Sequence, residues 1–291
     1  MGQATVSELS PRLNAFRSDL ADARLRGKVD APAFAEPRPA QVTVSVADIR
    51  REPRPDSSGD TQALYGETVD IFEEAEGWCW VQARADGYVG YMAGAALTAR
   101  HNEPTHIIIA PRTFLYPGPD MKLPAEMALS IGARISVAGE AETRGARYLT
   151  LANGGAIIAA HAAPIATKFS DPVAIAERLL ETPYLWGGRS GFGIDCSGLA
   201  QLAYAICGIN VQRDTDMQKD SAGRAFAEGS PLQRGDLVFW SGHVALMADE
   251  KTIIHASGHA MAVVKEDFAE AAARIGHMYG APTGFRRVMG G

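Results

Sequence analysis

The stretch that most limits the fold of this chain is residues 184–207, where a glycine-rich segment runs into an apolar helix pattern. Four glycines between residues 187 and 193 let the backbone bend sharply and adopt positive φ. From Leu199 onward the apolar residues recur at helical spacing. Cys196 lies between the two, so we expect it in the first turn of a mostly buried helix. A thiol there faces the positive end of the helix dipole, which favours the nucleophilic thiolate. A free cysteine is otherwise usually a small buried hydrophobe.

Two histidines on predicted strands can supply the base that a cysteine nucleophile needs. His243 begins one strand, His255 ends the next, and a tight turn joins them. Because side chains alternate between the faces of a sheet, the rings meet only if His255 lies opposite an odd-numbered residue such as Ala245. The loop between the strands must then have an odd number of residues, or a bulge must shift the register.

Zinc binding is the alternative chemistry, because cysteine and histidine are common zinc ligands. The nearest third ligand is His259, and the spacing matches no common zinc site. A single histidine at a strand start is also most often a plain edge residue. We therefore expect nucleophilic chemistry, with no metal and no cofactor.

The patterns along the chain predict four segments. Residues 1–40 form an arm with a short helix over 11–26, whose apolar side chains need another domain to cover them. Residues 41–102 alternate apolar and polar residues as β-strands do, and Asp86-Gly87 marks a hairpin turn. Residues 103–166 repeat this pattern faintly, at an offset of 64 to 68 residues, which predicts a second small barrel.

Residues 167–291 change to a mixed pattern. A helix is expected to begin at Asp171-Pro172 and to end at Pro183. Thr215 and Gln218 have the spacing of a capping box, which predicts another helix start. Strands rich in β-branched and aromatic residues follow. Helices first and antiparallel strands afterwards make an α+β domain.

Composition excludes several classes of function. A net charge of −6 does not suit a nucleic-acid partner. The three cysteines form no C-x-x-C pair and are typical of a reducing compartment. No stretch approaches the ~18 apolar residues of a membrane span, and the N-terminal sequence lacks an apolar run of signal-peptide length. We therefore expect a cytoplasmic protein, whose oligomeric state stays open.

Two parts of the sequence resemble known families. Residues 64–92 resemble a bacterial SH3 domain, a small barrel found attached to cell-wall enzymes, and residues 103–166 are similar but degenerate. The strings YLWGGRSGFGIDCSGLAQLAY, QRGDLVFWSGHVALM and TIIHASG, in this order, resemble the NlpC/p60 family of papain-like cysteine peptidases over roughly residues 170–290. The resemblance implies two SH3-like barrels followed by a papain-like α+β catalytic domain.

The string WGG-x-SGFG-x-DCSG after SH3 domains is similar to the γ-D-glutamyl-L-diamino-acid endopeptidases. The similarity implies cleavage of peptidoglycan stem peptides between D-glutamate and a diamino acid, either meso-diaminopimelate or lysine. The expected substrates carry a free N-terminal L-alanine, as peptides released in cell-wall recycling do. The sequence does not choose between the two diamino acids.

The resemblance also implies roles for single residues. Cys196 is the nucleophile, His243 the base, and His255 the polar group that orients the base. Tyr184 helps to stabilise the oxyanion, and Asp195 binds the free amine of the substrate. Further substrate contacts are implied for Ser197, Glu67, Tyr88 and Tyr91. Plain packing of Tyr184 and a solvated Glu67 are the structural alternatives.

Two other functions fit the same motifs. The chain could be a non-catalytic peptidoglycan-binding protein that retains a peptidase fold, although the presence of the cysteine and both histidines argues against this. The same thioester could instead serve acyl transfer to an amine. Product analysis with and without an acceptor amine separates acyl transfer from hydrolysis.

Overall fold

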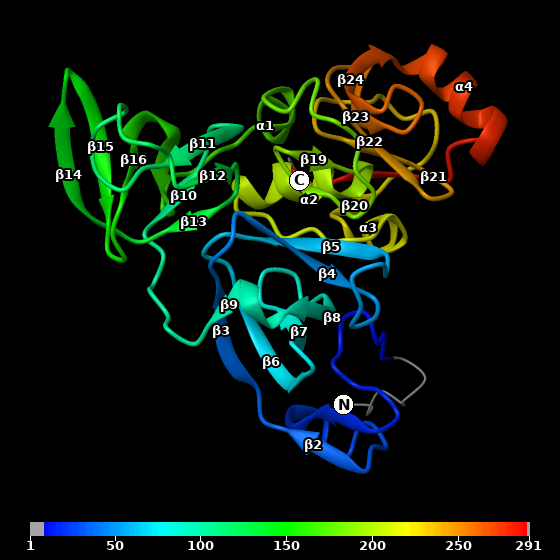
Figure 1. The fold of residues 1–291 in the computed structure, drawn as a ribbon. Helices are drawn as coiled ribbons and strands as arrows, with labels where there is room; N and C mark the ends of the chain where they lie inside the picture. The colour runs from blue at the N-terminus through cyan, green and yellow to red at the C-terminus, as the bar shows by residue number, and fades with distance from the viewer. Residues whose placement is uncertain (1–8, 290–291) are drawn as a thin grey trace. The chain divides into compact units, whose positions relative to one another are not determined.

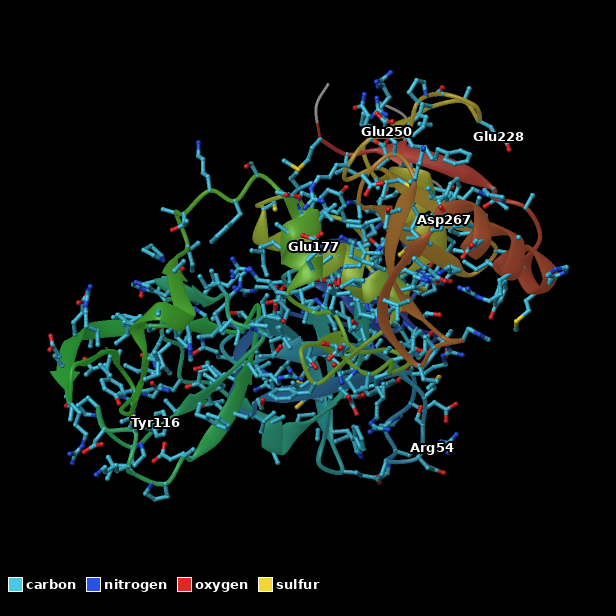
Figure 2. The ribbon with its side chains drawn as sticks, turned by 90° about the horizontal axis from the view of Figure 1, so that it is seen from above. Arg54, Tyr116, Glu177, Glu228, Glu250 and Asp267 are labelled. Carbon is cyan, nitrogen blue, oxygen red and sulfur yellow. The ribbon has the colours of Figure 1, made fainter. Side chains whose placement is uncertain are left out.

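The computed structural model describes residues 9–289 and divides the chain into two compact units. Unit 1 is Met1–Ile165 and unit 2 is Ala166–Gly291, so the boundary lies one residue before the predicted start of the α+β domain (Figure 1). Charged side chains such as Arg54 of unit 1 and Glu228 of unit 2 are exposed at the surface (Figure 2). No helix among residues 9–289 is both long and apolar enough to cross a membrane.

The arm at the start of unit 1 forms short strands instead of the predicted helix. Strands β1 (Leu20–Asp22) and β2 (Ala33–Ala35) pair in parallel, with the 3-10 helix η2 (Ala23–Leu25) between them. The prediction of a helix over residues 11–26 is therefore wrong. Asp22 accounts for part of the difference, because its carboxylate accepts a hydrogen bond from Arg24 N (2.9 Å) and so competes with helical backbone pairing.

The rest of unit 1 covers part of the arm's apolar surface, as predicted, and another part is covered within the arm, where Phe16 packs with Leu25. Ala15 packs with Phe72 and Trp80 in one buried cluster. The Arg17 guanidinium lies over the Trp80 ring, 4.6 Å from its centroid, and donates a hydrogen bond to Glu73 (2.5 Å). These contacts fix the arm on the sheet that follows it.

Residues 38–98 form one antiparallel sheet of seven strands in the order β5-β4-β8-β7-β6-β3-β9. Strands β7 and β8 form the predicted hairpin, with Gly87 at φ +82° in its turn. The elements are β3 (Arg38–Val42), β4 (Val46–Arg50), β5 (Gly59–Leu64), β6 (Thr68–Ala75), β7 (Trp78–Ala83), β8 (Val89–Ala93), η3 (Gly94–Ala96) and β9 (Leu97–Thr98).

Residues 106–164 repeat this order of elements but divide it among three small antiparallel sheets, β13-β10-β17, β11-β12 and β14-β15-β16. Because the strands do not join into one sheet, a second SH3-like barrel stays a prediction. The elements are β10 (His106–Ile108), β11 (Arg112–Leu115), β12 (Met127–Ser130), β13 (Arg134–Ile135), β14 (Val137–Thr143), β15 (Ala146–Leu151), β16 (Ala156–Ile158), η4 (Ala159–His161) and β17 (Ala162–Pro164).

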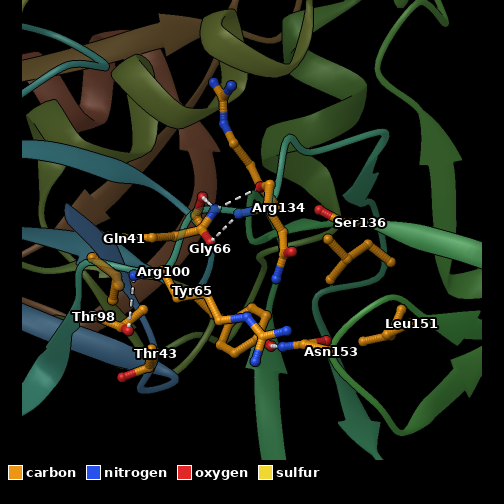
Figure 3. A pocket seen from close by; sticks show the side chains of 13 residues that line it. Gln41, Thr43, Tyr65, Gly66, Thr98, Arg100, Arg134, Ser136, Leu151 and Asn153 are labelled. Atoms are coloured by element: carbon orange, nitrogen blue, oxygen red, sulfur yellow. Dashed lines mark hydrogen bonds between the residues drawn. The ribbon is translucent and has the colours of Figure 1, made fainter. Parts of the chain in front are cut away.

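A polar pocket lies in unit 1 where residues of both halves meet (Figure 3). Arg134 N donates a hydrogen bond to Tyr65 O (2.8 Å), and Asn153 Nδ2 donates to the Tyr65 hydroxyl (2.7 Å). Gln41 Nε2 donates to Gly66 O (3.0 Å). The bonds from Arg134 and Asn153 join residues 106–164 to residues 38–98 across the pocket, and the Gln41 bond lies within the first half.

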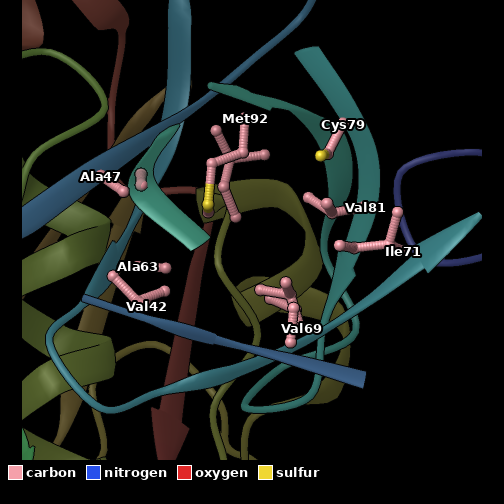
Figure 4. Close-up of a cluster of buried hydrophobic side chains, with 12 residues drawn as sticks. Val42, Ala47, Ala63, Val69, Ile71, Cys79, Val81 and Met92 are labelled. Atoms are coloured by element: carbon pink, nitrogen blue, oxygen red, sulfur yellow. The ribbon is translucent and has the colours of Figure 1, made fainter. Parts of the chain in front are cut away.

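Unit 1 has two apolar cores, and the second also includes Leu64 and Tyr65 of the first half. In the first half the buried side chains are mostly small or β-branched, among them Val42, Ala47 and Val69 (Figure 4). The second half buries a cluster that includes Ile108 and Leu149. The period-2 alternation that predicted the strands is therefore the pattern that builds these cores.

Unit 2 is built on a six-stranded antiparallel sheet in the order β20-β25-β21-β22-β23-β24. Helix α2 packs against β22 and β23, and α4 lies beside β24 (Figure 1). The α+β class predicted for this part is confirmed. The elements are α1 (Pro172–Glu177), β18 (Arg189–Ser190), β19 (Gly193–Ile194), α2 (Cys196–Ile206), α3 (Thr215–Ser221), β20 (Arg224–Ala225), β21 (Leu237–Trp240), β22 (His243–Met247), β23 (Thr252–Ser257), β24 (Ala262–Asp267), α4 (Phe268–Tyr279) and β25 (Gly284–Arg287).

The helix starts of unit 2 were predicted with mixed success. Helix α1 begins at Pro172, and the Asp171 carboxylate caps it by accepting bonds from the next two backbone N–H groups, as predicted. The helix ends at Glu177, well before Pro183. A helix does begin at Thr215, as predicted, but the capping box is wrong: the cap of α3 is Asp214, and Gln218 donates to Ser197 O (2.9 Å).

Candidate active site

The glycine-rich loop packs its backbone directly against the start of α2. A Cβ at Gly198 would lie 2.3 Å from Gly188 O, and a Cβ at Gly188 would lie 2.6 Å from Gly193 O. Only glycine fits at such distances, and Gly187 also has φ +74°. The loop therefore sets where α2 begins, and with it the position of Cys196.

Cys196 is the first residue of α2, as the sequence predicts, and is only 6% exposed. Its Sγ lies 4.0 Å from the Thr215 hydroxyl, and the backbone N–H of Val244 also interacts with the thiol. Val244 follows His243 on β22, so the sulfur lies beside the strand that carries the predicted base.

The prediction that the helix dipole makes Cys196 a thiolate is wrong for this structure. Burial, followed by the negative charge of Asp195, raises the pKa of the thiol to about 11. The Val244 N–H and Thr215 lower the pKa by less. Desolvation disfavours the charged form and outweighs the favourable groups at the helix start.

The two predicted histidines meet on one face of the sheet. Leu246 pairs with Ile254 and Met247 with Ile253, a register that continues to Ala245 opposite His255. The five residues 248–252 connect the paired positions, which is an odd number. The register predicted from the pleat is therefore confirmed. His243 Nε2 lies 2.7 Å from His255 Nδ1.

Beyond His255 lies an ion pair that the sequence analysis missed. His255 Nε2 is 2.6 Å from Glu266 Oε1, and Arg274 donates to both oxygens of Glu266 at 2.7 and 2.6 Å. Glu266 pairs with Ile253 across β23 and β24, which places it on the face of His255. The same argument from alternating faces, applied to the hairpin of β23 and β24, could have identified Glu266. No comparable sequence pattern points to Arg274 on α4.

The environment separates the charge states of these groups. Burial first, and then His255, lowers the pKa of His243 from its ordinary 6.5 to about 3. The hydrogen bond from His255, together with Arg274, lowers the pKa of Glu266 to about 2 despite its partial burial. At neutral pH the site therefore holds a neutral His243 and an ionised Glu266.

Asp195 is buried in a hydrogen-bond network with a second missed residue, Arg213. The Arg213 guanidinium is 1% exposed and donates to both carboxylate oxygens, at 3.0 and 2.7 Å. Asp195 also accepts bonds from Gly187 N (2.9 Å), Gly198 N (2.7 Å) and the Ser197 hydroxyl (3.2 Å). Five donors fill the roughly four lone-pair sites of a carboxylate. Asp195 and Ser197 thus have hydrogen-bond partners within the protein. The prediction that both residues bind the substrate did not include these partners.

Tyr184 lies near the thiol at the start of the glycine-rich loop, in a bridge with Ile194. Burial raises the pKa of its hydroxyl, with smaller contributions from Cys196 and Asp195. The hydroxyl therefore keeps its proton over the physiological range and can donate a hydrogen bond.

The three predicted contacts in unit 1 also have local partners. Glu67 is buried and accepts a hydrogen bond from Leu64 N (2.9 Å). Tyr88 is buried beside the hairpin turn, where its N–H donates to Asp86 (3.0 Å). The Tyr91 hydroxyl accepts a bond from Arg17 of the arm (3.1 Å). Their role toward a substrate stays a prediction.

The described residues do not include a cluster of ligands for the alternative of zinc binding. Within residues 9–289, no group of three or more His, Cys, Asp or Glu side chains is arranged to hold a metal ion.

Comparison with known proteins identifies both parts of the chain. Residues 181–274 match the NlpC/P60 family, and residues 49–97 match the bacterial dipeptidyl-peptidase Sh3 domain. A crystal structure of an NlpC/P60 family protein from Bacillus cereus has a TM-score of 0.72 over 87% of this chain and 100% of that chain, at 23% identity. That likeness shows a shared fold.

Two curated relatives carry the name gamma-D-glutamyl-L-lysine dipeptidyl-peptidase. The one from Bacillus cereus is 28% identical over 225 residues, which cover 67% of this chain and 66% of the relative. The one from Bacillus subtilis is 30% identical over 197 residues, which cover 62% and 64%. The match spans just under two thirds of each relative's length. The predicted resemblance is confirmed: residues 181–274 form a domain of the NlpC/P60 family, and this domain follows a bacterial dipeptidyl-peptidase Sh3 domain at residues 49–97.

Proposed function

We propose that the chain is a cysteine peptidase that hydrolyses the bond between γ-D-glutamate and a diamino acid in peptidoglycan stem peptides with a free N-terminal L-alanine. The observation that carries the proposal is the hydrogen-bonded pair of His243 and His255 on β22 and β23, the two strands against which α2 packs. Cys196 is the first residue of α2, and its thiol interacts with the N–H of Val244, the residue after His243. The family match and the names of the two relatives support the substrate class.

The proposed reaction begins from a neutral thiol and a neutral imidazole. As Cys196 Sγ attacks the γ-carbonyl carbon, its proton moves to His243, whose other nitrogen is held by His255. The tetrahedral intermediate then collapses, the C–N bond breaks, and His243 gives its proton to the departing amine. A water molecule attacks the thioester, His243 takes the water proton, and the carboxylic acid and the thiol are released.

The proposed oxyanion site consists of backbone N–H groups at the start of α2 and the Tyr184 hydroxyl. The first N–H groups of a helix have no partners within the helix and point toward the position of the developing charge. The raised pKa of Tyr184 keeps its hydroxyl a donor. Losing one such donor typically costs ~3 kcal/mol of transition-state stabilisation.

Recognition of a free amine is the part of the proposal that concerns specificity. A dipeptidyl-peptidase, as the relatives are named, releases two residues from a free N-terminus. Asp195 with Ser197, and Glu67 with Tyr88 or Tyr91, are the candidate ligands for that amine. At Asp195 an ammonium would share a carboxylate already paired with Arg213. A substrate with a free amine fits peptides released during cell-wall recycling; a cytoplasmic location stays a prediction.

The first test removes the proposed nucleophile. Cys196→Ala should abolish cleavage of L-Ala-γ-D-Glu-diaminopimelate and of its lysine analogue, measured by mass spectrometry of the products, while circular dichroism shows an unchanged fold. Cys79→Ala, which removes a buried cysteine of unit 1, is the matched control and should retain activity. Turnover by Cys196→Ala would refute the assignment of the nucleophile.

The same assay tests specificity. Blocking the N-terminal amine by acetylation should reduce kcat/KM at least ~100-fold, because a buried polar site left without its partner is costly. Equal cleavage of free and acetylated peptides would refute amine recognition. If an added amine increases the amount of an acyl-transfer product at the expense of the hydrolysed peptide, the chain is a transferase.

A further inference from the structure

The pair Glu266–Arg274 lies at the end of a continuous line of hydrogen bonds that begins at His243. The line runs from His243 to His255 (2.7 Å), from His255 to Glu266 (2.6 Å) and from Glu266 to Arg274 (2.6 and 2.7 Å). Its members come from β22, β23, β24 and α4 in turn. The order in space thus follows the order in sequence.

The chemistry at Glu266 fixes the direction of the hydrogen bonds that it makes. An ionised carboxylate only accepts hydrogen bonds, and Arg274 only donates them. His255 Nε2 must therefore carry a proton and donate a hydrogen bond to Glu266. If His255 carries only this proton, its Nδ1 has a lone pair and accepts the hydrogen bond from His243 Nε2.

The same reasoning decides which nitrogen of His243 can act as a base. If Nε2 of a neutral His243 carries the proton, Nδ1 carries the lone pair. With the opposite arrangement, His255 Nδ1 would donate to His243 Nε2, and Nδ1 of His243 would carry a proton. Such a ring could not accept the proton of a thiol. His255 is 1% exposed, so the protein groups around it decide the choice.

We propose that Glu266, held by Arg274, is a positioning residue that sets the tautomers of His255 and His243 and so aims the basic nitrogen of His243 at Cys196. This inference rests on the proposed function for the role of the base, but the tautomers themselves can be measured without a substrate. Neither Glu266 nor Arg274 is assigned contact with the substrate.

A charge-swapped variant, Glu266→Lys with Arg274→Glu, gives the sharpest test. The swap keeps an ion pair between β24 and α4 but faces His255 with a group that only donates. His255 must then accept at Nε2, and both histidines change tautomer. We expect ¹⁵N NMR of the imidazoles to show the proton of His243 moving from Nε2 to Nδ1.

The activity of the swapped variant should fall because the tautomer of His243 changes. An imidazole in the wrong tautomer costs about 10⁴-fold in kcat in the Ser-His-Asp triad, and we expect a loss of ~10³–10⁴-fold here with little change in KM. Glu266→Asp keeps an accepting carboxylate and should retain the wild-type tautomers and most of the activity. Thermal unfolding of each variant confirms that it is folded.

Lys265→Met is the matched control. Lys265 neighbours Glu266 on β24 and forms an ion pair with Glu177 (2.9 Å) on α1, the residue labelled in Figure 2. This variant also removes a charged partner from the strand, yet it should leave kcat and both tautomers unchanged.

The outcomes separate the two proposals. Wild-type tautomers or wild-type kcat in the folded swapped variant would overturn the positioning role of Glu266. If the tautomers change as expected but the wild-type protein cleaves no γ-D-glutamyl peptide, the positioning role stands and the substrate assignment fails.

Discussion

At the scale of single residues, the resting site is a neutral pair instead of an ion pair. The pKa of Cys196 is raised to about 11 and that of His243 is lowered to about 3, both mainly by burial. A thiolate facing an imidazolium is therefore a minor form of the free protein. The proton leaves the thiol as the sulfur attacks, so the position of the base matters more than a preformed charge.

This charge state predicts the pH dependence of thiol alkylation. Only the thiolate reacts, so modification of Cys196 by iodoacetamide should become about tenfold faster per pH unit between about pH 6 and pH 10. The pKa of the thiol lies above this range, and His243 stays neutral throughout it. Peptide mapping by mass spectrometry distinguishes Cys196 from Cys207.

His243→Ala is the control for this measurement and should leave the profile unchanged. A fast plateau from about pH 5 upward that His243→Ala removes would instead reveal a thiolate–imidazolium pair, and would contradict the neutral pair.

At the scale of elements, the start of α2 depends on backbone packing that leaves no room for a side chain. Alanine in a helix interior is normally more stabilising than glycine by ~1 kcal/mol. At Gly198 the added Cβ would lie 2.3 Å from Gly188 O, a backbone atom of the loop. We expect Gly198→Ala to lower the free energy of unfolding by ~1–3 kcal/mol, the usual cost of overpacking.

The comparison is with Gly276→Ala in α4, where an added Cβ meets nothing within 4 Å. That variant should gain about 0.5–1 kcal/mol. Urea unfolding measures both. A stabilised Gly198→Ala would show that the loop shifts freely, and that the glycines do not fix the helix start.

The elements that were predicted correctly are those whose signals are local. The Asp86-Gly87 turn, the cap at Asp171 and the strands around His243 each follow from a pattern within a few residues. The register that joins His243 to His255 also followed, because parity depends only on loop length. The helix start at Cys196 followed from the glycines before it.

The elements that were missed depend on partners far along the chain. The arm at 11–26 has helical spacing of apolar residues, but packing on Trp80 and the local bond of Asp22 outweigh it. Arg213 meets Asp195 from a loop, and Arg274 meets Glu266 from α4. The thiolate was mispredicted because a helix dipole is visible in a sequence, whereas the degree of burial is not.

At the scale of the whole molecule, unit 2 has a core of its own. Val238, Ala245 and Ile253 pack with Ala271 of α4 in one buried cluster. We expect residues 166–291, expressed alone, to fold and to retain the alkylation profile of Cys196. Cooperative unfolding followed by circular dichroism tests the fold.

The isolated unit 2 also tests the predicted contribution of Glu67. If unit 1 supplies ligands for the substrate amine, unit 2 alone should cleave free and acetylated tripeptides at similar rates. Discrimination equal to that of the full chain would assign amine recognition to unit 2, and would leave Asp195 as the candidate carboxylate.

The short connection 248–252 has a further consequence for how this protein can diverge. A change of one residue there would turn His255 to the opposite side of its strand, unless a bulge absorbs it, and would break the line to Glu266. A change of two residues would restore the facing. Active descendants of this sequence should therefore differ at this hairpin by two residues at a time. In a library of variants with random connection lengths, those with an odd number of residues should be active and those with an even number inactive.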